Sequence, residues 1–225
     1  VFWLSLIPGS MALLILVFLV EERVGKGAGK LELLKGVRDV LRGNFVLLLL
    51  VVTIFSLGAF NFSFILLNAK EAGAIDELIP LLYAVINVSH TLIAIPSGLL
   101  ADRMGKEKVL VMGYATFLAT TLLILLWPAN YYLAFVIAVV FGAYDGIANT
   151  VTRALIPRYA GSALRGTAYG LYYLVVGMSF FTANTVVGTL WQYFGSAIAV
   201  IYSIALSIIA IIGMMLFINH QNIKL

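Results

Sequence analysis

A few polar side chains interrupt the long apolar stretches of this sequence, and their chemistry needs an explanation. Asp145 is the only acid well inside such a stretch, and Asn149 follows it by four residues. On a helix this spacing places both side chains on one face, which Thr152 and Arg153 continue. An uncompensated charge in apolar surroundings is costly. We therefore expect Asp145 to carry a transferable proton, to bind a cationic solute, or to form a structural link to Arg153 or to another helix.

His90 and Asn87 form a second polar pair, about one helical turn apart. Because imidazole titrates near neutral pH, His90 is a candidate for proton binding. The same ring can instead donate a hydrogen bond to a neighbouring helix with no role in proton transfer. Both interpretations of His90 stay open on the sequence alone.

Asn61 and Asn184 stand beside phenylalanines. An amide next to aromatic rings suits the binding of small organic molecules, although such rings also serve packing or lipid contact. The phenylalanines are Phe60, Phe62 and Phe64 beside the first, and Phe180 and Phe181 beside the second. The full set of candidates for substrate binding or proton coupling is Asn61, Asn87, His90, Asp145, Asn149 and Asn184.

Other chemistry finds no support in the sequence. The absence of cysteine excludes disulfides, thiol catalysis and cysteine-ligated metals. Residues 25–30, Gly-Lys-Gly-Ala-Gly-Lys, lack the spacing of a phosphate-binding loop, and no strand precedes them. A membrane-embedded enzyme would need clustered histidines or acids near one interface, and two histidines with one interior Asp are too few. We predict no enzyme activity, no catalytic residues, no cofactor and no metal.

The composition places these residues in a membrane protein. Of the 225 residues, 63% are hydrophobic and 11% charged, and the mean hydropathy is +1.08. Average soluble domains are about 45–50% apolar and about 25% charged. Several apolar runs reach about 20 residues, enough for a helix to cross a hydrocarbon core about 30 Å thick. None shows the two-residue alternation of a barrel strand, so the predicted fold class is all-α, a polytopic membrane protein with a lipid bilayer around it.

Seven transmembrane helices are predicted, with basic residues gathered on alternate connections. Of the 14 Lys and Arg residues, 13 lie on one face of the predicted membrane, and Lys70 lies on the other. The positive-inside rule assigns the basic face to the cytoplasm, so the carboxyl terminus should be cytoplasmic in a multi-pass protein of the cell (inner) membrane. These bases sit in the connections between spans, which argues against nucleic acid as a partner. The spans lie near residues 2–20, 44–68, 78–101, 108–127, 131–154, 167–190 and 195–218.

The connection at 21–43 is the only long one. Glycines at 25, 27 and 29 predict a flexible joint. Apolar residues at helical spacing then predict an amphipathic helix on the cytoplasmic surface. Because the chain lacks an initiator Met, we expect it to begin inside a longer protein. The expected domains are the last helix of an amino-terminal bundle at 1–20, an inter-bundle linker at 21–43 and a six-helix bundle at 44–225.

The loop at 98–110 carries a specific motif. It reads Gly-Leu-Leu-Ala-Asp-Arg-Met-Gly-Lys-Glu-Lys-Val-Leu, which resembles the G-x-x-A-D-R-x-G-R-K signature of the major facilitator superfamily. Lys106 replaces Arg, and Glu107 is inserted before Lys108. An ordinary positive-inside turn is the alternative interpretation. The stretches 156–171 and 188–195, and the opening 7–9 with 21–22, are similar to the same superfamily.

This resemblance implies that the spans are helix six of twelve followed by helices seven to twelve. It further implies a cavity between two six-helix bundles that works by alternating access, with a small-molecule substrate, a coupled proton and the amino-terminal bundle as partners. Helices seven, eight, ten and eleven should line the cavity, while nine and twelve face lipid. An aromatic, sparsely charged cavity favours export. A seven-helix receptor is the alternative, although it would not explain the motif.

The motif also predicts a gate. Asp102 should lie near the amino end of the span at 167–190, where the helix dipole favours an anion and Arg165 can pair with it. The expected gating residues are Gly98, Asp102, Arg103, Gly105, Lys106 and Arg165.

Two glycine pairs predict close helix crossings. Gly142 with Gly146 and Gly166 with Gly170 are each four residues apart, and such pairs let helix backbones approach closely in membranes.

Overall fold

The computed structural model describes residues 10–11, 14–15, 18, 36–41, 43–126, 131–160 and 164–222. The chain divides into two compact units, Val1–Lys35 and Gly36–Leu225. The described residues of the first unit, all helical, are Ser10, Met11, Leu14, Ile15 and Phe18. Most of the predicted first span at 2–20 and the glycine joint therefore lie outside the described residues.

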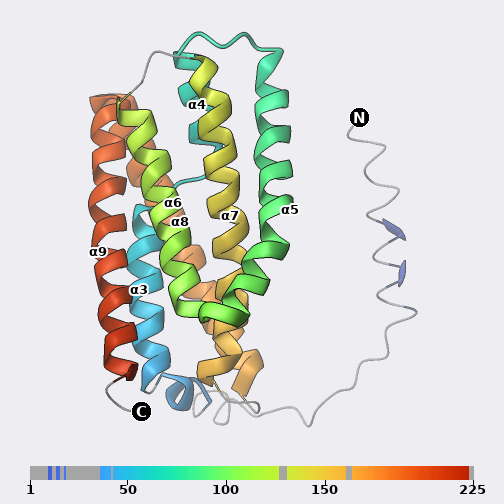
Figure 1. The fold of residues 1–225 in the computed structure, drawn as a ribbon, viewed down its shortest axis with the longest axis vertical. Helices are drawn as coiled ribbons and strands as arrows, with labels where there is room; N and C mark the ends of the chain where they lie inside the picture. Colours follow the sequence, from blue (N-terminus) through green and yellow to red (C-terminus); the bar gives the residue numbers. More distant parts are fainter. Residues whose placement is uncertain are drawn as a thin grey trace. The chain divides into compact units, whose positions relative to one another are not determined.

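The described part of the second unit consists of helices that run side by side (Figure 1). Six segments in it are long and apolar enough to cross a membrane, α3 and α4 together counting as one. They match the six predicted spans from residue 44 onward, which confirms the all-α polytopic fold. The helices are α3 Asn44–Gly58, α4 Phe62–Glu71, α5 Leu78–Met104, α6 Lys106–Leu126, α7 Tyr131–Ala160, α8 Arg165–Phe194 and α9 Ser196–Asn222.

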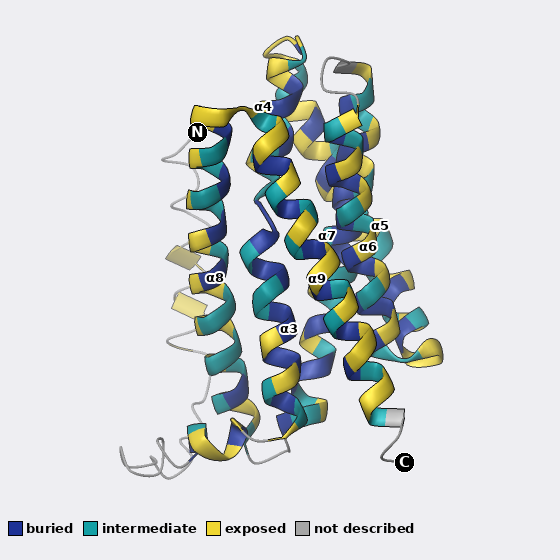
Figure 2. Ribbon diagram, turned by 90° about the vertical axis from the view of Figure 1, so that its left-hand side faces the viewer, coloured by how far each residue is buried: buried dark blue, intermediate teal, exposed yellow. Residues whose placement is uncertain are grey.

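Burial is unequal among these spans (Figure 2). In the most apolar window of each, 56% of the α3–α4 residues are buried, against 17% for α5 and 22% for α8. Large apolar side chains stand exposed on both of these helices, among them Ile95 on α5 and Phe181 on α8. Lipid or other protein must cover these faces, because water would solvate them poorly.

The predicted crossing at Gly142 and Gly146 is confirmed, and it joins α7 to α5. A Cβ atom added at Gly146 would lie 2.5 Å from the carbonyl oxygen of His90, and one added at Gly142 would overlap the carbonyl oxygen of Ile86. These distances leave no room for a side chain, so the two backbones are in direct contact. A Cβ at Gly98, on the same α5, would meet Thr150 at an ordinary 3.6 Å.

The second predicted crossing, at Gly166 and Gly170, has no partner among the described residues. A Cβ added at Gly166 or Gly170 would meet nothing within 4 Å among the described atoms. The pattern alone does not specify a partner, and here the glycines lie on the poorly covered helix α8.

The span expected at 44–68 is confirmed as Asn44–Glu71, but it consists of two helices instead of one. The α3 helix ends at Gly58 and α4 starts at Phe62. Between them Asn61 takes an extended backbone conformation, and its side-chain oxygen accepts a hydrogen bond of 3.0 Å from the Ser63 N–H. This N-cap starts a new helix instead of continuing the old one.

The end of the predicted linker packs with the bundle. Residues 36–40 form a helical segment in which Val40 is buried while Arg38 is exposed. Val40 belongs to a small apolar cluster with Phe45 and Ile156. The amphipathic pattern is thus present at 36–40, while 19–35 lie outside the described residues.

The glycine crossing makes a direct prediction. Gly142→Ala and Gly146→Ala should each destabilise the protein by about 1–3 kcal/mol, because the new Cβ overlaps the α5 backbone. Gly98→Ala is the matched control, because its added Cβ would meet Thr150 at an ordinary 3.6 Å, and it should be neutral or stabilising by up to ~1 kcal/mol since Ala favours helix over Gly. Thermal unfolding in detergent measures all three variants. Equal melting of the control and the two crossing variants would show that the crossing does not limit stability.

Candidate functional site

A cavity of about 460 Å³ lies between the helices of the bundle. Its described lining comes from α3, α4, α5, α6, α7 and α8 and from the interruption at 59–61. The lining residues are Val52, Phe55, Ser56, Ala59, Phe60, Asn61, Phe62, Tyr83, Ile86, Asn87, His90, Tyr114, Phe141, Tyr144, Asp145, Ala148, Asn149, Thr152, Tyr172, Tyr173, Val176, Gly177 and Phe180. This volume suits a small organic molecule.

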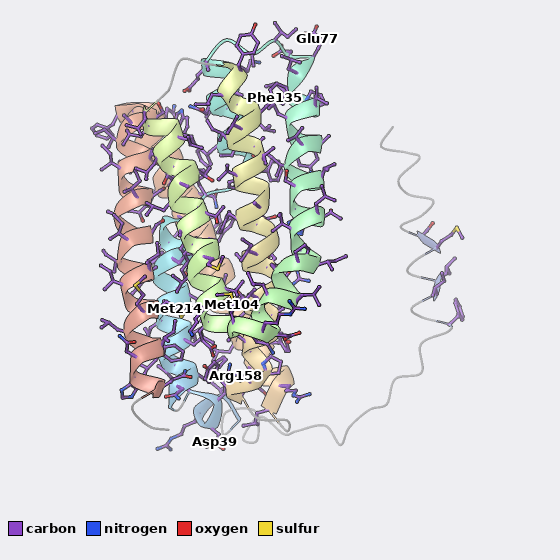
Figure 3. All side chains as sticks on the ribbon, viewed as in Figure 1. Asp39, Glu77, Met104, Phe135, Arg158 and Met214 are labelled. Carbon is purple, nitrogen blue, oxygen red and sulfur yellow. The ribbon has the colours of Figure 1, made fainter. Side chains whose placement is uncertain are left out.

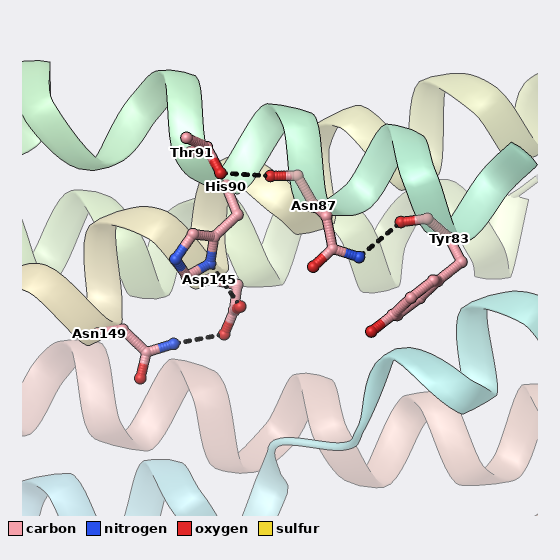
Figure 4. Close-up of polar contacts among 6 residues, drawn as sticks. All are labelled: Tyr83, Asn87, His90, Thr91, Asp145 and Asn149. Atoms are coloured by element: carbon pink, nitrogen blue, oxygen red, sulfur yellow. Dashed lines mark hydrogen bonds and ion pairs between the residues drawn. The ribbon is translucent and has the colours of Figure 1, made fainter. Parts of the chain in front are cut away.

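Three of the predicted residues form one hydrogen-bonded group in the cavity wall (Figure 4). The His90 Nδ1 atom lies 2.7 Å from Oδ2 of Asp145, and the Asn149 side-chain amide donates to Oδ1 of Asp145 at 2.7 Å. Both carboxylate oxygens of Asp145 are therefore hydrogen-bonded, one to His90 of α5 and the other to Asn149 of α7. The interaction is an ion pair when the imidazole is protonated and a neutral hydrogen bond to the carboxylate when it is not.

The glycine crossing explains why these side chains meet. Gly146 follows Asp145 in the chain, and its backbone touches that of His90. Contact of the two backbones at this level leaves the adjacent side chains within reach of each other. The suggested link from Asp145 to Arg153 is wrong, since Asp145 bonds to another helix and Arg153 is exposed outside the cavity lining.

The cavity is electrostatically simple. Apart from tyrosines, its only ionisable described lining residues are His90 and Asp145, and no Lys or Arg of the described chain lines it. Their side chains are 34% and 37% exposed, so water screens the pair but can also bring protons to it. With an ionised Asp145, the net charge of the pair is zero when His90 is protonated and minus one when His90 is neutral.

The remaining asparagine candidates have different surroundings. Asn87 lines the cavity, and its amide donates to the Tyr83 carbonyl on its own helix at 2.8 Å, which leaves its side-chain oxygen available (Figure 4). Asn61 lines the cavity at the helix interruption. Asn184 does not belong to the lining, and its side-chain oxygen instead accepts the Asn61 N–H at 3.0 Å. Asn184 thus ties α8 to the interruption.

Aromatic rings form much of the wall, as expected, but one comes from an unexpected helix. Tyr114 belongs to α6, the span that should face lipid, and yet it lines the cavity. Its ring stacks on Phe55 with centroids 3.7 Å apart and planes 7° apart. The sequence prediction rested on acids, amides and histidines and missed Tyr114, although its hydroxyl in an apolar stretch was the available signal.

Comparison with known sequences decides the family. The profile of the Major Facilitator Superfamily matches residues 46–223, most of the chain. The chain belongs to the major facilitator superfamily. It is also similar to an uncharacterized MFS-type transporter of Methanocaldococcus jannaschii, with 28% identity over 206 residues. The match covers 86% of this chain and 51% of that protein, so the chain spans about half the length of its relative.

The signature loop of this major facilitator chain lies at one end of the bundle. Gly105 has a positive φ of 98° and ends α5, as the predicted tight turn requires. Asp102, Arg103 and Arg165 are exposed, and Lys106 is partly exposed. Within the described chain no ion pair joins Asp102 to Arg165, so the expected gate is not closed through this pair here.

The inserted Glu107 of the loop makes the contacts that sequence reasoning missed. It is only 7% exposed, and Arg158 of α7 pairs with it at 3.0 Å near the basic end of the bundle (Figure 3). The Tyr159 hydroxyl also donates to Glu107, and Gln221 of α9 donates to that hydroxyl at 2.6 Å. An acid inserted directly between two bases, Lys106 and Lys108, was the signal. This group, Glu107, Arg158, Tyr159 and Gln221, connects the ends of three helices of the major facilitator bundle.

Proposed function

We propose that the protein transports a small solute across a membrane by alternating access, with the cavity as the carboxyl-terminal half of its binding site. One observation carries the proposal: a cavity within a membrane-spanning bundle contains a hydrogen-bonded His90–Asp145 pair on an aromatic wall. Binding sites of such carriers lie near the bilayer midplane between two repeats. An amino-terminal six-helix bundle of the same protein completes the cavity and covers the exposed faces of α5 and α8.

The His90–Asp145 pair is the proton-coupling site of this proposal. One proton changes the charge of the cavity wall by one unit, so the protonation state alters the affinity for a charged or polar solute. The side chains of His90 and Asp145 are 34% and 37% exposed, so protons can reach both of them from the cavity. Proton-driven export fits the aromatic wall with a single carboxylate. A purely substrate-binding carboxylate is the second candidate role for Asp145.

Asp145→Asn should abolish accumulation driven by a pH gradient and preserve counterflow exchange, because exchange requires no net proton movement. His90→Gln should weaken coupling in the same direction, since it removes the other half of the pair. Reconstituted liposomes with an imposed pH gradient measure both activities. Asp76→Asn is the control, because that carboxylate is 76% exposed and pairs with Lys70 outside the cavity.

Three outcomes separate the roles of Asp145. Loss of accumulation alone supports coupling. Parallel loss of accumulation and exchange, with weakened binding, assigns the carboxylate to the substrate. Intact proton-driven transport in Asp145→Asn removes the residue from the coupling mechanism.

The end of the bundle that carries the signature loop is proposed to face the cytoplasm. In the described chain Arg103, Lys108 and Arg158 lie toward this end and Lys70 near the other. Single cysteines at the exposed positions Arg38 and Lys108 should react with an impermeant thiol reagent only after the membrane is opened. Cysteines at the exposed Gly73 and Glu77 should react in sealed cells. The reverse pattern would invert the proposed orientation.

Asp102 and Arg103 are proposed to hold the cytoplasmic ends of α5 and α8 together when the cavity opens outward. Asp102→Asn should then slow transport several-fold while expression and substrate binding stay close to wild type. Glu107→Gln is the contrasting variant: it disturbs a buried, bonded carboxylate and should lower thermal stability. Unchanged transport by Asp102→Asn would exclude the latch.

A further inference from the structure

The signature loop contains one buried charged side chain among exposed ones. Asp102, Arg103 and Lys108 are exposed, whereas Glu107 is only 7% exposed. Burial of a carboxylate is costly unless partners compensate its charge. An acid that is buried in a surface loop therefore needs an explanation.

The partners of Glu107 all come from other helices. One guanidinium nitrogen of Arg158 lies 3.1 and 3.0 Å from the two carboxylate oxygens, and the Tyr159 hydroxyl donates to one of them. The Tyr159 ring packs edge to face on Phe217 of α9 with centroids 5.6 Å apart, and Gln221 of α9 donates to its hydroxyl at 2.6 Å. The first turn of α6 is thus anchored to α7 and, through Tyr159, to α9.

The loop is too short to separate this anchor from the expected gating residues. Gly105 is the only residue between α5 and α6. Its N–H donates to the Ala101 carbonyl at 3.1 Å, and its carbonyl accepts the Val109 N–H at 3.3 Å, so the turn is bonded on both sides. A shift at the first turn of α6 is therefore transmitted to Asp102 and Arg103 in the last turn of α5.

Both helices beside the loop are held against the same helix, α7. The α5 helix meets α7 at the crossing of Gly142 and Gly146, and α6 meets it through Glu107 and Arg158. The loop therefore has a fixed position relative to α7. Within the described chain no ion pair joins this loop to α8, so the loop is held in place without being engaged by α8.

We propose that Glu107 is a positioning residue of the cytoplasmic gate. Through Arg158 and Tyr159 it holds the signature loop against α7, where Asp102 and Arg103 can engage α8. The inference rests on the proposed function, because it takes this loop to close the cavity during alternating access. Arg158 keeps its charge at any physiological pH, so the anchor persists while the protonation of the His90–Asp145 pair changes.

A reporter thiol in the cavity measures the gate without any substrate. Gly177 lines the cavity, and a Cβ atom added there meets nothing within 4 Å, so Gly177→Cys adds a thiol without overlap. The full-length protein, otherwise free of cysteine, is reconstituted in sealed vesicles. An impermeant thiol reagent is added on the side of the signature loop or on the opposite side. The ratio of the two modification rates shows to which side the cavity opens.

Glu107→Gln should raise this ratio in favour of the loop side about three- to tenfold, the equivalent of one lost hydrogen bond in the closed gate. Tyr159→Phe keeps the ion pair and removes one bond, so it should shift the ratio less in the same direction. This milder variant keeps the test decisive if Glu107→Gln does not fold. In an Asp102→Asn background, Glu107→Gln should add no further shift, because the contact that it positions is already lost.

Two matched controls separate positioning from charge and from stability. Lys108→Gln removes one exposed charge from the same loop and should leave the ratio unchanged. Tyr202→Phe loses the hydrogen bond of 2.9 Å to the Leu57 carbonyl, away from the loop, so it should melt at a lower temperature with an unchanged ratio.

The outcomes distinguish this inference from the gate itself. An unchanged ratio in Glu107→Gln and Tyr159→Phe, with lower melting temperatures, would mean that the carboxylate only stabilises helix ends. An equal rise of both rates would mean general loosening and would also overturn the inference, as would a full shift by Glu107→Gln in the Asp102→Asn background. A ratio that Asp102→Asn alone leaves unchanged would refute the latch of the proposed function.

Discussion

Direct contact between the backbones of α5 and α7 is the constraint on which the site depends. At Gly142 and Gly146 there is no space for a side chain between the two helices. Small residues of this kind allow membrane helices to pack without a hydrophobic driving force. Because the contact fixes the distance and rotation of α5 against α7, it also fixes where His90 stands relative to Asp145. Packing and chemistry are therefore specified by adjacent residues of the same helix, and a change in one is transmitted to the other.

Two bonded acidic side chains of this bundle, Glu107 and Asp145, differ in how their charge is compensated. Glu107 is almost fully enclosed and bonded to both Arg158 and Tyr159, so its charge is compensated by a partner that keeps its own charge at any physiological pH. Asp145 is partly exposed and bonded to a histidine, a side chain that can be neutral or protonated. The first arrangement suits a permanent connection between helix ends. The second suits a group whose state varies during a cycle.

The sequence predicted the spans well, because a long apolar run can be recognised from the residue types of that segment alone. Six of the predicted spans are helical in the structure. It failed where the outcome depends on a distant partner. The two glycine pairs have the same spacing, yet among the described residues only Gly142 with Gly146 meets another backbone. Likewise the i, i+4 spacing correctly joined Asp145 to Asn149, while the bond to His90 depends on tertiary packing. Tyr114 was missed because its residue type is ordinary in an apolar stretch, and only its position reveals that it lines the cavity.

The interruption between α3 and α4 changes the mechanics of this span. Bending a continuous helix inside a bilayer breaks backbone hydrogen bonds that no water can replace, at several kcal/mol for each group. Here the backbone is already extended at Asn61, and its N–H is bonded to the Asn184 side chain instead of to its own helix. That side-chain bond is worth about 1 kcal/mol, and it replaces a bond that a continuous helix would make within itself. The ten residues of α4 are held by contacts of their own, since Ile65 and Ala69 are buried and Trp191 of α8 donates to Glu71 at 2.8 Å. The direction of α4 is therefore set by its own packing and is independent of the axis of α3, without the bending of a continuous helix.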